Sequence, residues 1–188
     1  MEQPLPYNYV IYFCEGNDSR CSNDLLLSCA SDYTGLPIQN FRRIQEEGQK
    51  PRLEGPLDLH FSVSHSGNYW MCAFGPSPVG LDLQQHRSCR CEALARRFFH
   101  PDEIQWMEEN GFTPQHFYDF WTAKESYVKL TGRGLGQGLS TFSVVPPLPD
   151  TPQWRHIPFL KEYSLCLCAD RIDHVKIQKM TEKRRKLF

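Results

Sequence analysis

The sequence feature that most restricts the fold is a long helix with both ends marked. Thr113 is a favourable N-cap, Pro114 suits the first helical position and Gly132 favours termination. These signals predict a helix over residues 114–131. At about 100° per residue, its apolar side chains form one stripe, made of Phe117, Phe120, Trp121, Tyr127 and Val128. One face of this helix must therefore pack against a core.

Three charged residues interrupt or border this apolar stripe. Lys124 falls near its centre, where an ammonium group is costly unless its stem reaches solvent or a buried anion meets it. Glu125 and Lys129 lie one turn apart at the border, a spacing that by itself also suits a routine surface ion pair. Three charges on the core side of one helix favour a functional interpretation over the routine one.

An upstream strand carries a carboxylate in an apolar setting. Residues 79–83 are predicted to form this strand, and Asp82 points away from its leucine neighbours. The ordinary interpretation is that an Asp at a strand end caps a turn. If the strand lies against the long helix, Asp82 and Glu125 supply the few carboxylates that Mg²⁺ needs and leave its other positions to water and phosphate. The sequence therefore predicts a magnesium site for a phosphate ester or pyrophosphate.

The rest of the chain alternates strand and helix patterns. Further strands are predicted at residues 9–13, 59–64, 69–74, 142–145 and 162–169, and further helices at 23–33, at 92–99 and from Pro101 onwards. The Pro-rich segment 76–78 is the clearest break, which divides the chain into an N-terminal half, 1–78, and a C-terminal half, 79–188. The basic segment 176–188 predicts a solvated terminal helix or tail, rather than a nuclear signal or nucleic-acid arm.

Composition excludes several classes of protein. With 188 residues, 40% hydrophobic and 23% charged, the chain matches an ordinary soluble globular protein. A formal net charge of −1 gives no reason to expect nucleic acid as a partner. No apolar run reaches the length of a membrane span, and the first six residues lack the features of a signal peptide, so we expect a cytoplasmic protein without a membrane partner.

The eight cysteines are expected to be free thiols in a reducing compartment. Cys89 and Cys91 are spaced C-x-C near His86 and His100, but two clean pairs of zinc ligands are missing. Cys166 and Cys168 share this spacing and are interpreted as facing one side of a strand.

Taken together, these residues resemble a known family. The motif Gly80, Leu81, Asp82, combined with Trp121, Lys124, Glu125, Ser126 and Lys129, resembles the two signature motifs of 4′-phosphopantetheinyl transferases of the surfactin-synthetase-activating type. Further similarity lies in Lys50 and Pro51, in residues 61–67 around Ser64 and His65, in residues 97–103 and in residues 132–135. The resemblance implies an α+β fold, with a pseudo-twofold pair of similar α/β subdomains and coenzyme A in the cleft between them.

The resemblance also implies an activity and roles for residues. The protein would transfer the 4′-phosphopantetheine arm of coenzyme A to a serine of an apo acyl, peptidyl or aryl carrier protein, as a monomer. Asp82 and Glu125 would bind Mg²⁺, with Glu125 also the general base. Lys124 and Lys129 would neutralise charge on the phosphate oxygens. The nucleotide end of coenzyme A would be held by Lys50, Ser64, His65 and Arg20.

Two features depart from the family pattern. Gln84 stands where the family often has a Glu, so its amide oxygen or a water would complete the metal site. The N-terminal region looks shorter than in most relatives, which removes some basic residues and leaves Arg20 as a survivor. The alternatives are a non-catalytic protein that only binds carriers, which Gln84 supports, and a magnesium-dependent phosphohydrolase.

A docking edge for the carrier is predicted from local charge. Carrier proteins of this kind present an acidic helix beside the reactive serine, which calls for a basic and apolar surface near the cleft. The segment with Arg96, Arg97, Phe98 and Phe99 fits that description. The alternative is that both phenylalanines are core residues and both arginines are merely solvated.

Overall fold

The computed structural model describes residues 8–16, 22–132, 138–145 and 152–180. Its strands are β1 (Asn8–Glu15), β2 (Arg42–Ile44), β3 (Arg52–Glu54), β4 (His60–Ser66), β5 (Tyr69–Gly75), β6 (Val79–Gln85), β7 (Gln153–His156), β8 (Tyr163–Ala169) and β9 (His174–Lys179). Its α-helices are α1 (Ser22–Thr34), α2 (Cys91–Phe98), α3 (Pro101–Asn110) and α4 (Pro114–Thr131), with 3₁₀ turns at Ile38–Asn40 and Leu139–Thr141. The α+β class expected from the sequence is confirmed.

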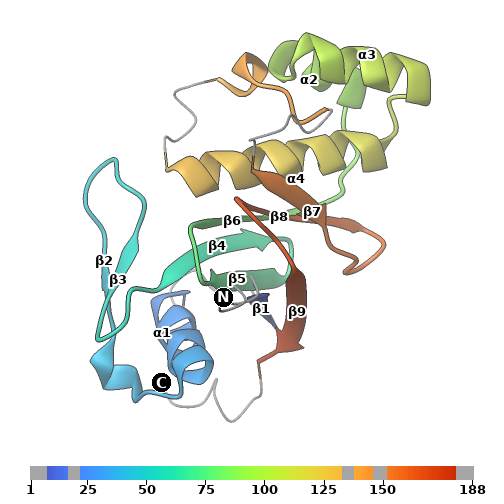
Figure 1. Ribbon diagram of the computed structural model, residues 1–188. Helices are drawn as coiled ribbons and strands as arrows, with labels where there is room; N and C mark the ends of the chain where they lie inside the picture. The colour runs from blue at the N-terminus through green and yellow to red at the C-terminus, as the bar shows by residue number, and fades with distance from the viewer. Residues whose placement is uncertain (1–7, 17–21, 133–137, 146–151, 181–188) are drawn as a thin grey trace.

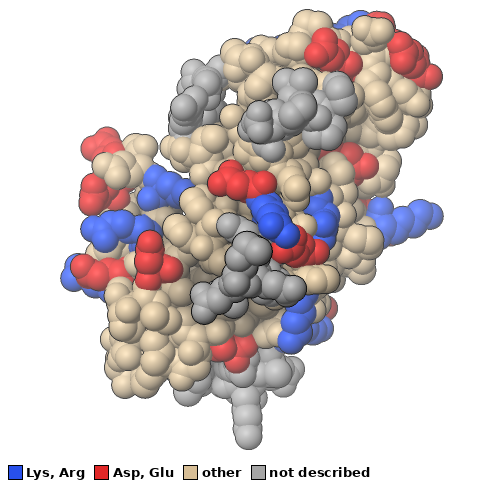
Figure 2. Space-filling model, viewed as in Figure 1, with Lys and Arg blue, Asp and Glu red and all other residues tan. Residues whose placement is uncertain are grey.

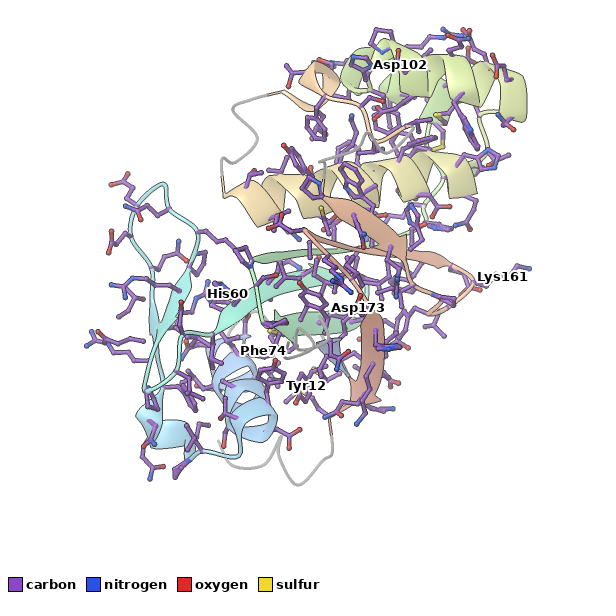
Figure 3. All side chains as sticks on the ribbon, in the orientation of Figure 1. Tyr12, His60, Phe74, Asp102, Lys161 and Asp173 are labelled. Atoms are coloured by element: carbon purple, nitrogen blue, oxygen red, sulfur yellow. A yellow bond between two sulfur atoms is a disulfide. The ribbon has the colours of Figure 1, made fainter. Side chains whose placement is uncertain are left out.

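The first sheet has the strand order β4-β5-β1-β9, and α1 covers one of its faces (Figure 1). The β4–β5 hairpin predicted from the sequence is present, with Phe61 paired to Phe74. Tyr12 and Phe74 lie in the core between this sheet and α1, with their rings in edge contact at 6.1 Å (Figure 3). β2 and β3 form a separate two-stranded ribbon that extends from the first half.

The second sheet has the order β6-β8-β7 and packs between the first sheet and α4. The core between the sheets includes Ile11 and Met71 from the first sheet, and Leu81 and Leu165 from the second. α2 and α3 lie on the far side of α4, around a third core (Figure 1). The molecule is thus layered, with α4 between the second sheet and the α2–α3 pair.

Helix α4 has the bounds that its capping residues predict. The Thr113 hydroxyl accepts a hydrogen bond from the His116 N–H at 3.1 Å. Gly132 ends the helix in the left-handed conformation, with φ of 69°, and its N–H donates to the Val128 carbonyl. Local signals were sufficient here because both ends of the helix are capped by residues next to it in the sequence.

The strand predicted at residues 142–145 is wrong. This segment follows the Leu139–Thr141 turn as irregular chain, and its backbone groups bond to buried side chains. The Phe142 carbonyl accepts from Lys124 at 2.6 Å, and the Val144 N–H donates to Glu103 at 2.8 Å. These side chains take the place that a neighbouring strand would have.

The predicted solvated tail is wrong for residues 176–179. They belong to β9, which runs parallel to β1 and pairs Ile177 with Ile11. Half-buried Val175 and Ile177 alternate with exposed Lys176, a period-2 pattern that the surrounding charges obscure. β9 therefore follows the second sheet in the chain but joins the first. Residues 181–188, with the remaining basic residues, lie outside the described part of the chain.

The prediction of free thiols is wrong for one pair. Cys89, in the loop before α2, and Cys91, the first residue of α2, form a disulfide, and a Cα–Cα distance of 5.2 Å lets the two side chains meet. The other described cysteines are buried thiols that are not part of this disulfide, and Cys21 lies outside the described residues. Cys166 and Cys168 are both buried in β8 on the side that faces α4.

Charged side chains of both signs lie interspersed on the face that Figure 2 shows, in agreement with the near-zero net charge. None of the helices in the described segments combines the length and apolar character needed to cross a bilayer.

Candidate active site

The candidate site lies where β4, β6 and α4 meet, and Gly80 allows that meeting. A Cβ atom at Gly80 would collide with the Ser126 carbonyl oxygen of α4 and would lie 2.7 Å from the Leu130 N–H nitrogen. β6 and α4 can therefore approach closely only because residue 80 has no side chain. The approach brings Asp82, two residues further along β6, to the face of α4 that carries Glu125 and Lys129.

Asp82 is buried, with one carboxylate oxygen bound and the other unpartnered. Oδ1 accepts hydrogen bonds from Lys129 Nζ at 2.7 Å and from Ser64 Oγ at 2.9 Å. Oδ2 is buried and has no hydrogen-bond partner among the described residues. Burial raises the pKa of Asp82, while Lys129 and Ser64 oppose that shift. A buried carboxylate oxygen without a partner is costly, and a bound cation would remove that cost.

Glu125 and Gln84 face the same cavity, which has a volume of about 390 Å³. Burial raises the pKa of Glu125, and the neighbouring charge of Asp82 raises it further. Within the described residues, the Gln84 amide nitrogen makes a long 3.5 Å contact to the Gln85 carbonyl. The structure therefore brings together all three side chains that the sequence assigned to the metal.

These side chains fit a magnesium ion. Mg²⁺ prefers oxygen ligands and is commonly held by one or two carboxylates, with water and substrate phosphate completing its shell. Asp82 and Glu125 supply two carboxylates, and the unpartnered Oδ2 of Asp82 gives one of them an open lone pair. Within the described segments, no group of three or more His, Cys, Asp or Glu side chains is arranged to hold a metal. The donor set therefore consists of two carboxylates and one amide oxygen, which leaves the other octahedral positions of Mg²⁺ without a side-chain ligand from this set.

Lys129 joins this cavity to a larger one. Its ammonium group donates to Asp82 Oδ1 at 2.7 Å, and to Ser64 Oγ and the Leu81 carbonyl at 3.0 Å each. Lys129 and His65 line both cavities. A phosphate group at the junction would therefore meet the Lys129 ammonium directly.

The larger cavity, of about 440 Å³, is lined by cationic side chains from both halves of the chain. Lys50 donates to the Val79 carbonyl at 2.7 Å, and burial, with a smaller effect of Lys129, lowers its pKa to about 8. Arg43 of β2 also lines the cavity, and its buried Nε has no partner in the described part of the protein. Such a cavity suits a phosphorylated ligand.

Arg43 is a candidate that the sequence analysis missed. A signal exists in the two-residue spacing from Phe41, a buried residue in extended conformation just before β2, because residues two apart in an extended chain point to the same side. Arg20, which the resemblance assigned to the coenzyme, lies outside the described residues.

Lys124 lies apart from the other predicted site residues, because it lines neither cavity as the described residues define them. Its side chain is 0% exposed, and its ammonium donates to Glu103 Oε1 at 2.7 Å and to the Phe142 carbonyl at 2.6 Å. Burial lowers the pKa of Lys124, and the Glu103 charge opposes that shift. A buried anion thus meets this lysine, as its place in the apolar stripe required, and that anion is Glu103 of α3.

The sequence matches a known family over more than half of its length. The sequence profile of the 4′-phosphopantetheinyl transferase superfamily matches residues 78–179. The chain belongs to this superfamily. Asp82, Gln84, Glu125 and Lys129 lie within the matched residues, which confirms the resemblance drawn from the motifs.

Curated relatives agree with this membership. The chain is 37% identical over 143 residues to a 4′-phosphopantetheinyl transferase of Bacillus subtilis, covering 69% of this chain and 63% of the relative. It is 34% identical over 122 residues to the 4′-phosphopantetheinyl transferase Sfp of Bacillus subtilis (strain 168), covering 64% and 54%. It is 32% identical over 166 residues to the 4′-phosphopantetheinyl transferase ffp of Bacillus subtilis, covering 79% of this chain and 72% of the relative. The chain therefore spans less than two thirds of the length of the first two relatives.

Proposed function

We propose that this protein transfers the 4′-phosphopantetheine arm of coenzyme A to a serine of an apo carrier protein. The observation that carries the proposal is the half-satisfied Asp82 carboxylate, which lies with Glu125 beside a cavity lined by Lys50, Arg43 and Lys129. A magnesium-dependent reaction of a pyrophosphate requires carboxylates that bind the metal and, next to them, cationic side chains that bind the phosphates. Superfamily membership supports the same conclusion.

Coenzyme A is proposed to lie in the larger cavity and to reach the smaller one at Lys129. Lys50 from the segment before β3, His65 from β4 and Lys129 from α4 line the larger cavity, so the ligand would lie between the two predicted halves. Lys50 and Arg43 would hold the nucleotide phosphates through charge-assisted hydrogen bonds. The pyrophosphate would then lie beside Asp82 and Glu125.

Asp82, Glu125 and the Gln84 amide oxygen are proposed to hold Mg²⁺, whose charge would stabilise the negative charge on the pyrophosphate. The raised pKa of Glu125 suits a general base that accepts the proton of the carrier serine, directly or through a water. The serine oxygen then bonds to the phosphorus next to the pantetheine arm, and the bond to the bridging oxygen of the pyrophosphate breaks. Lys129 would stabilise the charge left on the departing adenosine bisphosphate.

For the carrier we propose a docking surface with fewer residues than the four that the sequence predicted. Arg96 is held by Glu92 and Glu108, both at 2.9 Å, so its charge is already paired. Phe99 is 2% exposed and belongs to the core. Arg97 instead lies over the half-buried ring of Phe98 at 5.1 Å, and these two remain the candidates for contact with an acidic helix. We propose that the protein acts as a monomer in the cytoplasm.

Mass spectrometry of intact carriers tests the proposal. A panel of apo carrier proteins is incubated with the protein, coenzyme A and Mg²⁺, and one carrier is expected to gain the mass of the phosphopantetheine arm. A chelator and omission of coenzyme A are the controls. No gain in mass on any carrier, with folded protein and saturating coenzyme A, would contradict the proposed function.

A further inference from the structure

Three serines of β4 provide the lateral partners of β6. Ser62, Ser64 and Ser66 alternate along β4 and so point to the same side. Their hydroxyl oxygens accept hydrogen bonds from the N–H groups of Leu81 at 3.0 Å, Leu83 at 3.0 Å and Gln85 at 2.9 Å. The opposite edge of β6 pairs with the backbone of β8. These three serines, here called the serine ladder, therefore replace a backbone partner at the boundary between the two sheets.

Ser64 differs from the other two because its hydroxyl has no hydrogen-bonding capacity left. A hydroxyl offers one proton and two lone pairs. The lone pairs of Ser64 Oγ accept from the Leu83 N–H at 3.0 Å and from Lys129 Nζ at 3.0 Å. Its single proton must therefore go to the remaining neighbour, Asp82 Oδ1, at 2.9 Å.

This arrangement orients the Asp82 carboxylate. Oδ1 accepts hydrogen bonds from Ser64 Oγ and Lys129 Nζ, so both lone pairs of that oxygen are used. Oδ2 is the atom left without a hydrogen-bond partner among the described residues. Rotation of the carboxylate would break two hydrogen bonds at once, which keeps Oδ2 in place as the available ligand atom.

We propose that Ser64 is a positioning residue, which fixes the Asp82 carboxylate so that Oδ2 is presented to a divalent cation. Its importance for catalysis rests on the proposed function. The resemblance assigned Ser64 to the nucleotide end of coenzyme A, but its hydroxyl proton is already donated to Asp82, and a phosphate oxygen needs a donor. The bond partners of Ser64 thus lie on the metal side of the site.

Ser66 offers a matched control. It makes the same ladder bond to β6, through Gln85, and its hydroxyl contacts neither Asp82 nor Lys129 within the described part of the chain. Ser66 is not among the described residues that line the two cavities. Ser62 lines the larger cavity and is therefore less suitable as a control. Both Ser64→Ala and Ser66→Ala leave one N–H of β6 unpaired, so both should lower the melting temperature. Ser64→Ala should lower it more, because it also removes the hydrogen bonds to Asp82 and Lys129.

Binding of Mn²⁺, followed by electron paramagnetic resonance with and without coenzyme A, separates the two roles. Because residues that orient metal ligands typically change metal affinity by about 10–100-fold, Ser64→Ala is expected to weaken Mn²⁺ binding by that factor. Ser66→Ala should bind Mn²⁺ as the wild type does. Ser64→Thr, which keeps the hydroxyl, should recover the lost affinity. Coenzyme A binding without metal should be unchanged in Ser64→Ala.

Several results would overturn the proposal. These are equal Mn²⁺ affinity in Ser64→Ala and the wild type, equal losses in Ser64→Ala and Ser66→Ala, or no Mn²⁺ binding by the wild type with coenzyme A present. A selective loss of metal-free coenzyme A binding in Ser64→Ala would return Ser64 to the coenzyme. If the wild type modifies no carrier, the proposed function fails, while the comparison of Mn²⁺ affinities still decides the role of Ser64.

Discussion

The ion pair between Lys124 and Glu103 allows a sharp separation of a structural role from a catalytic one. Both side chains are 0% exposed, and they meet at 2.7 Å between α4 and α3. Glu103 also accepts from the His100 N–H at 2.9 Å and the Val144 N–H at 2.8 Å, so it anchors the start of α3 and the segment after the 3₁₀ turn. Replacing Lys124 by Met removes one charge and leaves the other buried.

The magnitude follows from that burial. Breaking a buried pair by removing one partner costs about 3–5 kcal/mol, which for a chain of this size corresponds to a fall of about 6–20 °C in melting temperature. Replacing both partners by neutral residues is close to neutral by comparison. In Lys124→Met with Glu103→Gln, the amide oxygen can still accept from Val144, while the bonds from His100 and to the Phe142 carbonyl are lost at a cost of about 1 kcal/mol each. The double variant should therefore recover part of the stability that the single variant loses.

Calorimetry and the carrier-modification assay together decide between the roles. The single variant should be strongly destabilised, and the double variant should be more stable than the single variant. The double variant should retain transfer within a few-fold, because Lys124 lines neither described cavity. A stable double variant whose kcat falls by orders of magnitude would show that Lys124 acts on phosphate, as the sequence predicted. A single variant as stable as the wild type would refute the structural reasoning itself.

Three further predictions concern the coenzyme, the metal and the carrier. Because the pKa of Lys50 is lowered to about 8, coenzyme A affinity should fall as pH rises through about 8, and Lys50→Met should remove this dependence in titration calorimetry. Between about pH 8 and the ordinary lysine pKa, the folded protein binds fewer protons at this group than the unfolded chain does. Lys50 should therefore make the free energy of unfolding rise with pH over that range. Gln84→Glu adds a carboxylate and should tighten Mg²⁺ binding, and the wild type should bind Mg²⁺ much better with coenzyme A than without it; strong calorimetric binding to the apo protein, unchanged by coenzyme A, would contradict this account. Arg97→Glu should slow carrier modification at low salt, and less so at high salt. Arg96→Glu should have the smaller effect, because Arg96 already pairs with two glutamates. Identical carrier kinetics for Arg97→Glu and the wild type would place docking elsewhere.

Local signals in the sequence were enough to predict the elements that carry the site. The bounds of α4 follow from Thr113, Pro114 and Gly132, and the strand with Asp82 follows from a short apolar run. Both depend on residues close in the sequence, so no tertiary knowledge was needed. The interruption of apolar patterns by Asp82 and Lys124 also indicated correctly that buried charges occur there.

What the sequence left open depends on contacts between distant segments. The anion that meets Lys124 comes from α3, 21 residues earlier, and no pattern around either residue reveals the pairing. The segment at residues 142–145 has strand-like composition, but Glu103 and Lys124 take its backbone groups. β9 could be recognised only once β1 was known to lack a neighbour on that side.

The serine ladder shows a signal that was present and not used. Alternating serines at residues 62, 64 and 66 put three hydroxyls on one side of a strand, which is unusual for a buried position. Their partners are the N–H groups of β6, which also carries Asp82. A buried polar stripe of this kind therefore predicts a neighbouring strand edge.

The most direct test of the central claim follows both products of the transfer in one reaction. Wild-type protein, coenzyme A, Mg²⁺ and an apo carrier are combined, and holo-carrier and adenosine bisphosphate are quantified over time by mass spectrometry. We expect the two products to form in equal amounts, and both to form more slowly with Asp82→Asn than with the wild type. Nucleotide release without holo-carrier would indicate a hydrolase, and carrier binding without either product would indicate a non-catalytic protein; either result would contradict the account.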